Sequence, residues 1–326
     1  MYRDAFPNWG LRSMLIDLVP EFVAALKAPD PLAAYRRYID DHLPVLKAYW
    51  HNYIIDLDSP HAEDVFIRTV EAERKDLHAM LDSFDVAQAA NDTIARCEDL
   101  FEIDCPIDVY LTVGVGGANA GELVVGGRGI AFVCLEHFTG RANPDTLALG
   151  LKPQLISLWL AHEIAHCVRY LSPGSNSEIK RIIAEMGGYY DYWETGSRSS
   201  FRELLVNEGL ATAAARKVAP GFEPWDYLGY GRRQYRRLRE LEAFLTRHLH
   251  NELDHTGLGY RLRYLAGGAS ASQRLVGGKV IPVRSGYYIG HRMVETTVVE
   301  LGLHNALRTD AAYFEELEDQ AANQTA

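Results

Sequence analysis

The chain has 326 residues, of which 48% are hydrophobic and 24% charged, with 33 Lys and Arg against 44 Asp and Glu. This composition is typical of a globular protein and excludes a chain that is disordered throughout. The formal net charge of −11 argues against nucleic acid as a partner, because binding to phosphates needs a cationic surface. No segment reaches the roughly 18 consecutive apolar residues that span a bilayer, so we expect no membrane partner either.

The N-terminus and the cysteines indicate a cytoplasmic protein. Residues 1–9 contain no apolar core of a secretory signal. The 4 cysteines are scattered and form no C-x-x-C pair: Cys97, Cys105, Cys134 and Cys167. This spacing indicates neither a cysteine zinc site nor a disulfide framework, so we expect free thiols in a reducing compartment.

The first hundred residues predict helices. Apolar side chains recur at helical spacing from residue 11 to about 101, for example at Leu15, Leu18 and Phe22. Prolines divide this stretch into several helices: Pro29, Pro31 and Pro60. We therefore expect a helical N-terminal region over residues 1–105.

Three β-rich runs follow, at residues 107–115, 122–125 and 129–135. The pair Gly126-Gly127 predicts a tight turn between the last two runs. We expect the three runs to form a small antiparallel sheet. The glycine-rich segment 114–121 lacks the third glycine of G-x-G-x-x-G and is followed by no Lys-Ser/Thr pair, which favours a flexible loop over a nucleotide-binding loop.

Helical spacing returns after residue 150. Helices are predicted over residues 153–171, 176–190, 201–218, 225–253 and 286–303. Residues 257–285 are rich in glycine and predict an extended loop with a short hairpin. We therefore expect an α+β fold, mostly α, whose main domain spans residues 106–310 and is followed by an acidic tail over residues 311–326.

The segment His162-Glu163-Ile164-Ala165-His166 forms the pattern H-E-x-x-H on a predicted helix. The two histidines lie about 40° apart on one helix face, so both imidazoles can bind one metal ion. Glu163 lies beside them and would take a proton from a water whose pKa the ion lowers toward about 7. Nearly all flanking residues are apolar, and ionisable groups in such a helix are costly without a cation. The sequence therefore predicts a metal site here.

A catalytic zinc ion needs a third protein ligand and one open position. Five carboxylates follow as candidates: Glu178, Glu185, Glu194, Glu203 and Glu208. Glu208 lies in the middle of an apolar helix stripe, which disfavours an uncompensated charge. Glu185 is better explained by a surface ion pair with Arg181, and Glu203 is expected to be solvated beside Arg202. We therefore expect Glu208 to bind Zn²⁺ together with the two histidines.

This motif, followed by a helix that contains Asn207-Glu208-Gly209-Leu210-Ala211, resembles the gluzincin metallopeptidases. The closer likeness is to the predicted zinc-dependent proteases of domain of unknown function 2268, which carry a later G-Y-x-x-G helix. Gly286-Tyr287-Tyr288-Ile289-Gly290 stands at that place, and the likeness covers roughly residues 107–303.

The resemblance implies a zincin-like catalytic region, in which a small antiparallel-containing sheet packs on the HExxH helix. It also implies that an edge strand of this sheet binds the extended backbone of the substrate. The matching candidate for that strand is residues 129–135.

Together these features indicate a zinc-dependent hydrolase that cleaves peptide bonds in a peptide or peptide-like substrate. Glu163 would act as general base and later as the acid for the leaving amine. Tyr287 and His291, which open the last helix, are expected as catalytic groups that stabilise the oxyanion, with Tyr288 as an alternative. The alternative is that both tyrosines are packing residues, and Arg284 is either a surface residue or a site for a substrate carboxylate.

Two other functions remain open from the sequence. The same metal centre would suit a tailoring enzyme that acts on a small molecule or a modified peptide, with the glycine-rich loop 257–285 as its lid. Alternatively, the chain is a binding module with a vestigial zinc site, in which the N-terminal helices carry the interaction.

Overall fold

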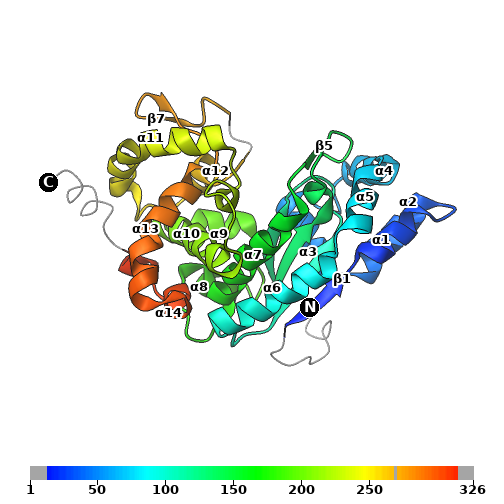
Figure 1. Cartoon of the computed structure of the whole chain (residues 1–326), viewed down its shortest axis with the longest axis horizontal. Helices are drawn as coiled ribbons and strands as arrows, with labels where there is room; N and C mark the ends of the chain where they lie inside the picture. Colours follow the sequence, from blue (N-terminus) through cyan, green and yellow to red (C-terminus); the bar gives the residue numbers. More distant parts are fainter. Residues whose placement is uncertain (1–12, 268–269, 315–326) are drawn as a thin grey trace.

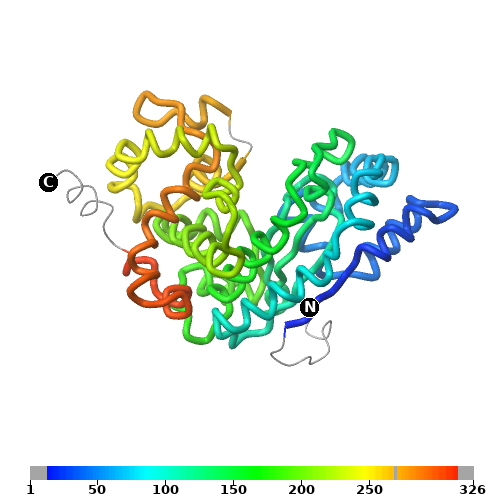
Figure 2. The backbone as a smooth tube through the Cα atoms, in the orientation of Figure 1, coloured from blue at the N-terminus to red at the C-terminus, as the bar shows by residue number. Residues whose placement is uncertain are grey.

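The computed structural model describes residues 13–267 and 270–314. It is mostly helical with small sheets, which confirms the expectation of an α+β fold that is mostly α (Figure 1). In Figure 2 the first third of the chain and the last third lie on opposite sides of the central green segment. In the described part of the chain, no helix combines the length and the apolar character needed to cross a bilayer.

Six helices make up most of the N-terminal region. They are α1 (Val19–Leu26), α2 (Pro31–Asp41), α3 (Val45–Tyr53), α4 (Ala62–Glu71), α5 (Lys75–Ser83) and α6 (Val86–Phe101). Two of them begin at an aspartate cap, where Asp30 accepts a hydrogen bond from the N–H of Ala33 and Asp85 from that of Gln88. The predicted helical character is therefore right for most of this stretch.

The exception is strand β1 (Met14–Asp17), where helical spacing is overridden by sheet pairing. The strand order is β1-β2-β4-β3, with β2 (Ile107–Thr112), β3 (Ala120–Val125) and β4 (Arg128–Cys134). β1 and β4 both run parallel to β2, and only β3 is antiparallel. The sheet is thus mixed, and it combines β1, from before the predicted boundary at residue 105, with three strands from after it.

The strand order corrects the prediction for the substrate-binding edge. The run 129–135 corresponds to β4, which lies between β2 and β3, and every residue of β4 is buried. A continuous apolar run is typical of such an interior strand. The edge strands of this sheet are β1 and β3, and β3 turns into β4 at the predicted tight turn, where Gly126 and Gly127 both have positive φ.

Helix α7 (Ile156–Leu171), which carries the H-E-x-x-H pattern, follows a 3₁₀ turn (Pro153–Leu155) and packs on the sheet, on α6 and on α10 (Phe201–Val218). Every residue from Leu158 to Tyr170 is buried, because the helix is covered on all sides. The bounds of α7 and α10 agree closely with the predicted helices.

Helix α13 (Ser285–Leu301) crosses α10 at a contact between two glycines. A Cβ atom on Gly209 would lie 2.1 Å from the carbonyl oxygen of Gly290, and one on Gly290 would lie 2.0 Å from that of Leu205. The glycines of the E-G-L-A and G-Y-x-x-G motifs therefore let two helix backbones touch. This contact fixes α13 against the helix that carries Glu208.

Further helices and four short strands complete the fold. They are α8 (Glu178–Glu185), α9 (Tyr192–Arg198), α11 (Arg232–Leu249), α12 (Leu258–Tyr264), α14 (Leu303–Arg308) and the short strands β5 (Ala142–Asn143), β6 (Ala148–Leu149), β7 (Leu275–Val276) and β8 (Lys279–Val280). The predicted loop 257–285 contains the expected hairpin, β7–β8, but also α12. Residues 315–326 of the predicted acidic tail lie outside the described residues.

Candidate metal centre

Helices α7 and α10 bring His162, His166 and Glu208 together. The Nε2 atoms of His162 and His166 lie 3.2 Å and 3.6 Å from the same carboxylate oxygen, Oε2 of Glu208. The two imidazole centroids are 4.7 Å apart, and all three side chains are buried. The three predicted ligands therefore meet at one point, and together they could hold a metal ion.

The buried ionisable groups of this cluster shift one another's pKa values. Burial raises the pKa of Glu208, but the neighbouring His166 and His162 outweigh burial and bring that pKa well below its usual range. Burial disfavours the charged form of His166, but the carboxylates of Glu208 and Glu122 raise its pKa to about 9. Burial lowers the pKa of His162. A buried carboxylate requires a positive charge nearby, and a metal ion held by these three side chains would supply it.

Glu163 lies beside the three ligands, together with Glu122 from β3. Glu122, Glu163 and His166 form a second buried group whose ligand atoms lie within 4.8 Å of one another. Burial raises the pKa of Glu163 well above its usual value, and Glu122 raises it further. A carboxylate in such surroundings is suited to accept a proton. The sequence analysis missed Glu122, although a glutamate within a β-rich run is an available signal.

A chain of hydrogen bonds joins Asn207, Tyr170 and Glu122 next to these two groups. The hydroxyl of Tyr170 donates to Oε1 of Glu122 at 3.0 Å, and Nδ2 of Asn207 donates to that hydroxyl at 2.9 Å. The ring of Tyr170 also stacks on that of His166, with centroids 5.9 Å apart. Side chains from α7, α10 and β3 therefore hold the cluster in place.

The last helix brings one of its two tyrosines to the cluster. The ring of Tyr287 stacks on that of His162, with centroids 6.0 Å apart and planes at 17°. Burial raises the pKa of Tyr287 well above its usual value, so its hydroxyl is protonated and can donate a hydrogen bond. Tyr288 points elsewhere and donates to Glu242 of α11. Of the two alternatives, only Tyr287 lies at the candidate centre.

His291 does not share this site, contrary to the prediction. Its Nε2 atom lies 3.2 Å from Glu295 and 2.7 Å from a guanidinium nitrogen of Arg216, and it does not line the cavity beside the cluster. The physical reason is the helix rise, which carries a residue about 6 Å along the axis in four positions. His291 is thereby displaced from Tyr287 toward the far part of α10.

The cluster opens into a cavity of about 620 Å³. Its walls come from α7, the end of α3, the edge strand β3, the start of α13 and the segment that follows α12. Arg261 and Arg284 both line it. The sequence analysis left Arg284 open between a surface residue and a site for a substrate carboxylate, and it did not identify Arg261. This volume lies within the range typical of small-molecule sites.

The glycine-rich segment 114–121 forms part of this cavity wall. The N–H groups of Gly114 and Gly116 donate to the carboxylate of buried Glu136, at 2.8 Å and 3.3 Å. Gly121 leaves room for Tyr53, because a Cβ atom there would lie 2.7 Å from the hydroxyl oxygen of Tyr53. These glycines therefore serve close packing and hydrogen bonding around the cavity.

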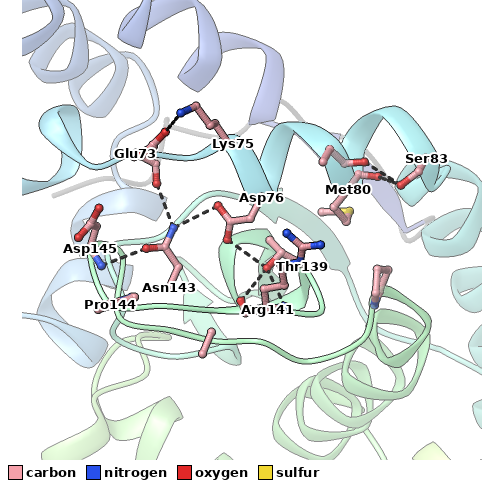
Figure 3. A pocket seen from close by; sticks show the side chains of 13 residues that line it. Glu73, Lys75, Asp76, Met80, Ser83, Thr139, Arg141, Asn143, Pro144 and Asp145 are labelled. Atoms are coloured by element: carbon pink, nitrogen blue, oxygen red, sulfur yellow. Dashed lines mark hydrogen bonds and ion pairs between the residues drawn. The ribbon is translucent and has the colours of Figure 1, made fainter.

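A second hollow, of about 750 Å³, lies between α5 and residues 139–145 (Figure 3). Two of its three acidic side chains are already paired: Asp76 accepts hydrogen bonds from Thr139 and Asn143, both at 3.1 Å, and Glu73 pairs with Lys75. Its lining contains no histidine and no cysteine. The chemistry therefore favours the smaller cavity beside the histidines.

Comparisons with protein-family models, with curated proteins and with solved structures find no match for this chain. The likeness to gluzincins therefore rests on the motif residues. The geometry of the site itself is the basis for assigning a function.

Proposed function

We propose that this chain is a gluzincin-like zinc metallopeptidase in which His162, His166 and Glu208 bind the ion. The observation that carries the proposal is the spacing of the three ligand atoms. Ligands at about 2.0–2.2 Å from a tetrahedral zinc ion lie about 3.3–3.6 Å from one another. The Glu208 oxygen lies 3.2 Å and 3.6 Å from the two imidazole nitrogens, which fits this geometry.

The donor set and the surroundings support the same assignment. Two imidazoles and one carboxylate are a known ligand set of catalytic zinc sites, and they leave one position open. The centre also faces a cavity rather than solid core. The packing of the H-E-x-x-H helix on a mixed sheet with an antiparallel edge strand also supports the proposal, because the resemblance to gluzincins implies a sheet packed on this helix.

When bound, zinc supplies a Lewis acid and lowers the pKa of a coordinated water. Glu163 takes a proton from the attacking water and passes it to the leaving amine. The hydroxyl of Tyr287 donates a hydrogen bond to the oxygen on which negative charge develops. Tyr170 and Asn207 hold the ring of His166 and the carboxylate of Glu122 in position.

The experiment is to replace Glu163 and to measure metal content and peptide hydrolysis in parallel. Glu163→Gln is expected to retain zinc and to lose about 10²–10⁴-fold in kcat, because the proton acceptor is gone and the ligands are intact. Glu194→Gln, which changes an exposed glutamate of α9, serves as the matched control and is expected to leave both quantities unchanged. A fully active Glu163→Gln variant would show that the proposed mechanism is wrong.

A further inference from the structure

We propose that the cavity accepts the carboxyl-terminal end of a short peptide, whose carboxylate binds Arg284, and that the end of α3 excludes a long extended chain. This inference rests on the proposed peptidase function and specifies its substrate class. Two independent observations carry it: the β3 edge is already occupied, and a guanidinium faces the cavity without a carboxylate partner.

The edge of β3 next to the metal centre is filled by Tyr53. The hydroxyl of Tyr53 accepts a hydrogen bond from the N–H of Glu122 at 3.2 Å and lies 2.8 Å from its C=O, to which it can donate. Two residues further, the C=O of Val124 accepts from the N–H of Tyr190 at 2.9 Å. An extended substrate would need these same backbone groups to pair with the edge strand. Pairing of a long peptide at this position is therefore blocked.

Three consecutive residues fix the end of α3 over the cavity. Besides the contacts of Tyr53, Nε2 of His51 lies 2.9 Å from the carboxylate of Asp191. Oδ1 of Asn52 accepts a hydrogen bond from the N–H of Tyr192 at 2.7 Å. The helix end thus bridges β3 and the start of α9, and it forms a wall of the cavity.

Arg284 lies next to Tyr287, directly before α13, and lines the same cavity. Its guanidinium carbon lies 4.2 Å from the ring centroid of Tyr287 and 5.7 Å from that of Trp159. Within the described ranges, no carboxylate lies at ion-pair distance from this guanidinium. Because Tyr287 also stacks on His162, the charge of Arg284 is one aromatic ring away from the metal ligands.

The local backbone is arranged around this arginine. Arg284 has φ 56° and ψ 26°, a left-handed conformation that is unfavourable for a residue other than glycine. The hydroxyl of Tyr230 donates to the carbonyl oxygen of Arg284 and holds the residue there. Gly229 leaves room for the side chain, since a Cβ atom on it would lie 2.9 Å from a guanidinium nitrogen.

The charges in the cavity favour a ligand with one negative charge, carried by a planar group with two oxygen atoms. Glu122, Glu163 and Glu208 also line the cavity and would repel a more highly charged group. The guanidinium of Arg261 is already bonded to Tyr190, Tyr192 and Thr195. Of the two arginines that line the cavity in the described part of the chain, Arg284 is therefore the one available to a ligand, and a single carboxylate fits its planar set of N–H donors.

The test compares peptides that differ only at the C-terminus. Zinc-loaded protein is assayed with a series of two- to six-residue peptides, each as the free acid and as the amide. We expect kcat/KM to be at least about tenfold higher for the free acids, since an anchoring ion pair with bidentate hydrogen bonds is lost in the amides. Arg284→Met is expected to bring the ratio of acid to amide close to one, chiefly through KM.

A matched control and a binding readout separate this inference from the proposed function. Arg232 also lies over an aromatic ring, that of Trp225 at 6.0 Å, but it is exposed and outside the cavity, so Arg232→Met is expected to retain the preference. Calorimetry on Glu163→Gln protein should show a dipeptide acid that binds at least about tenfold more tightly than its amide, and equal affinities once Arg284→Met is added.

The edge closure is tested with long amidated peptides. The Tyr53→Ala variant is expected to cleave these peptides faster than the unchanged chain, because the N–H and C=O groups of Glu122 become free to pair with the substrate. Equal kcat/KM and equal affinity for acids and amides would overturn the inference while leaving a zinc peptidase in place. If zinc is bound but no peptide of any length is cut, the proposed function fails, and the calorimetric comparison still decides whether Arg284 binds carboxylates.

Discussion

Arg169 of α7 and Glu203 of α10 form an ion pair with two parallel hydrogen bonds in the interior of the protein. The Nε atom donates to Oε1 at 3.1 Å and a terminal nitrogen donates to Oε2 at 2.8 Å. The side chain of Glu203 is 0% exposed, so the prediction that it is solvated is wrong. This pair joins the helix that carries the two histidines to the helix that carries Glu208.

Breaking this pair should destabilise the protein strongly. Glu203→Gln is expected to lower the free energy of unfolding by about 3–5 kcal/mol, because it leaves the charge of Arg169 buried without a counterion. Urea denaturation measures the change. Glu185→Gln, which breaks an exposed ion pair with Arg198, should lower the free energy of unfolding by no more than about 1 kcal/mol. Equal effects of the two substitutions would contradict the assignment of Arg169 and Glu203 as a buried clamp.

The helix crossing at Gly290 should tolerate no side chain. Gly290→Ala is expected to lower the free energy of unfolding by about 1–3 kcal/mol, since the added Cβ meets a backbone carbonyl. Weaker zinc binding should accompany it, because α10 must move. Gly259→Ala in α12 is the control, because no atom lies within 4 Å of the added Cβ and alanine favours a helix. Thermal unfolding and zinc titration of both variants check the prediction.

Helices α7 and α10 could be predicted from the sequence because their helical spacing of apolar residues agrees with their burial in the folded chain. Their apolar residues recur continuously, and a charge in the middle of such a pattern marks a position that needs compensation. For that reason the neighbourhood of His162 and His166 and the choice of Glu208 followed from residue types and spacing alone. The turn at Gly126-Gly127 followed from local backbone preference.

Other parts of the site depend on contacts between distant segments. Tyr53 and Glu122 are 69 positions apart, and nothing in the helical pattern of α3 indicates that its last residue bonds to a strand. β1 follows a helical pattern in sequence, but pairing with β2 decides its conformation. Glu203 can be buried because it pairs with Arg169 of another helix. The sequence neighbours of Glu203 do not reveal that partner.

The second tyrosine of α13 provides a control for the catalytic role of the first. Tyr287→Phe is expected to reduce kcat by about 10²–10³-fold with little change in KM, because it removes a hydrogen-bond donor to the transition state. Tyr288→Phe should have little effect on kcat, since the hydroxyl of Tyr288 bonds to Glu242. Steady-state kinetics on one peptide substrate compare the two. A Tyr287→Phe variant with unchanged kcat would assign that tyrosine to packing alone.

The bridge between α3 and α9 predicts a pH dependence of stability. Burial raises the pKa of Asp191, but hydrogen bonds from the N–H groups of Glu194 and Trp193 and from His51 outweigh it and leave that pKa below its usual value. The stabilisation is therefore fully present above the unfolded-state pKa of about 3.9 and is lost as pH falls through the lower folded-state pKa.

Asp191→Asn removes this charge and keeps a side chain that can cap α9. The free energy of unfolding of the unchanged chain should exceed that of the variant near pH 6, and the difference should shrink as the pH drops below about 4. Urea unfolding across this range measures the difference. A gap that stays constant down to pH 2 would show that the charge of Asp191 does not contribute.

The most direct test of the zinc site is elemental analysis of protein purified without added metal. The unchanged chain and Glu163→Gln should each contain about one zinc ion per chain, and Glu208→Ala should lose most of it, because only two of the three ligands remain. A chain without bound metal, or a Glu208→Ala variant that retains its full zinc content, would contradict the assignment of His162, His166 and Glu208 as the ligands.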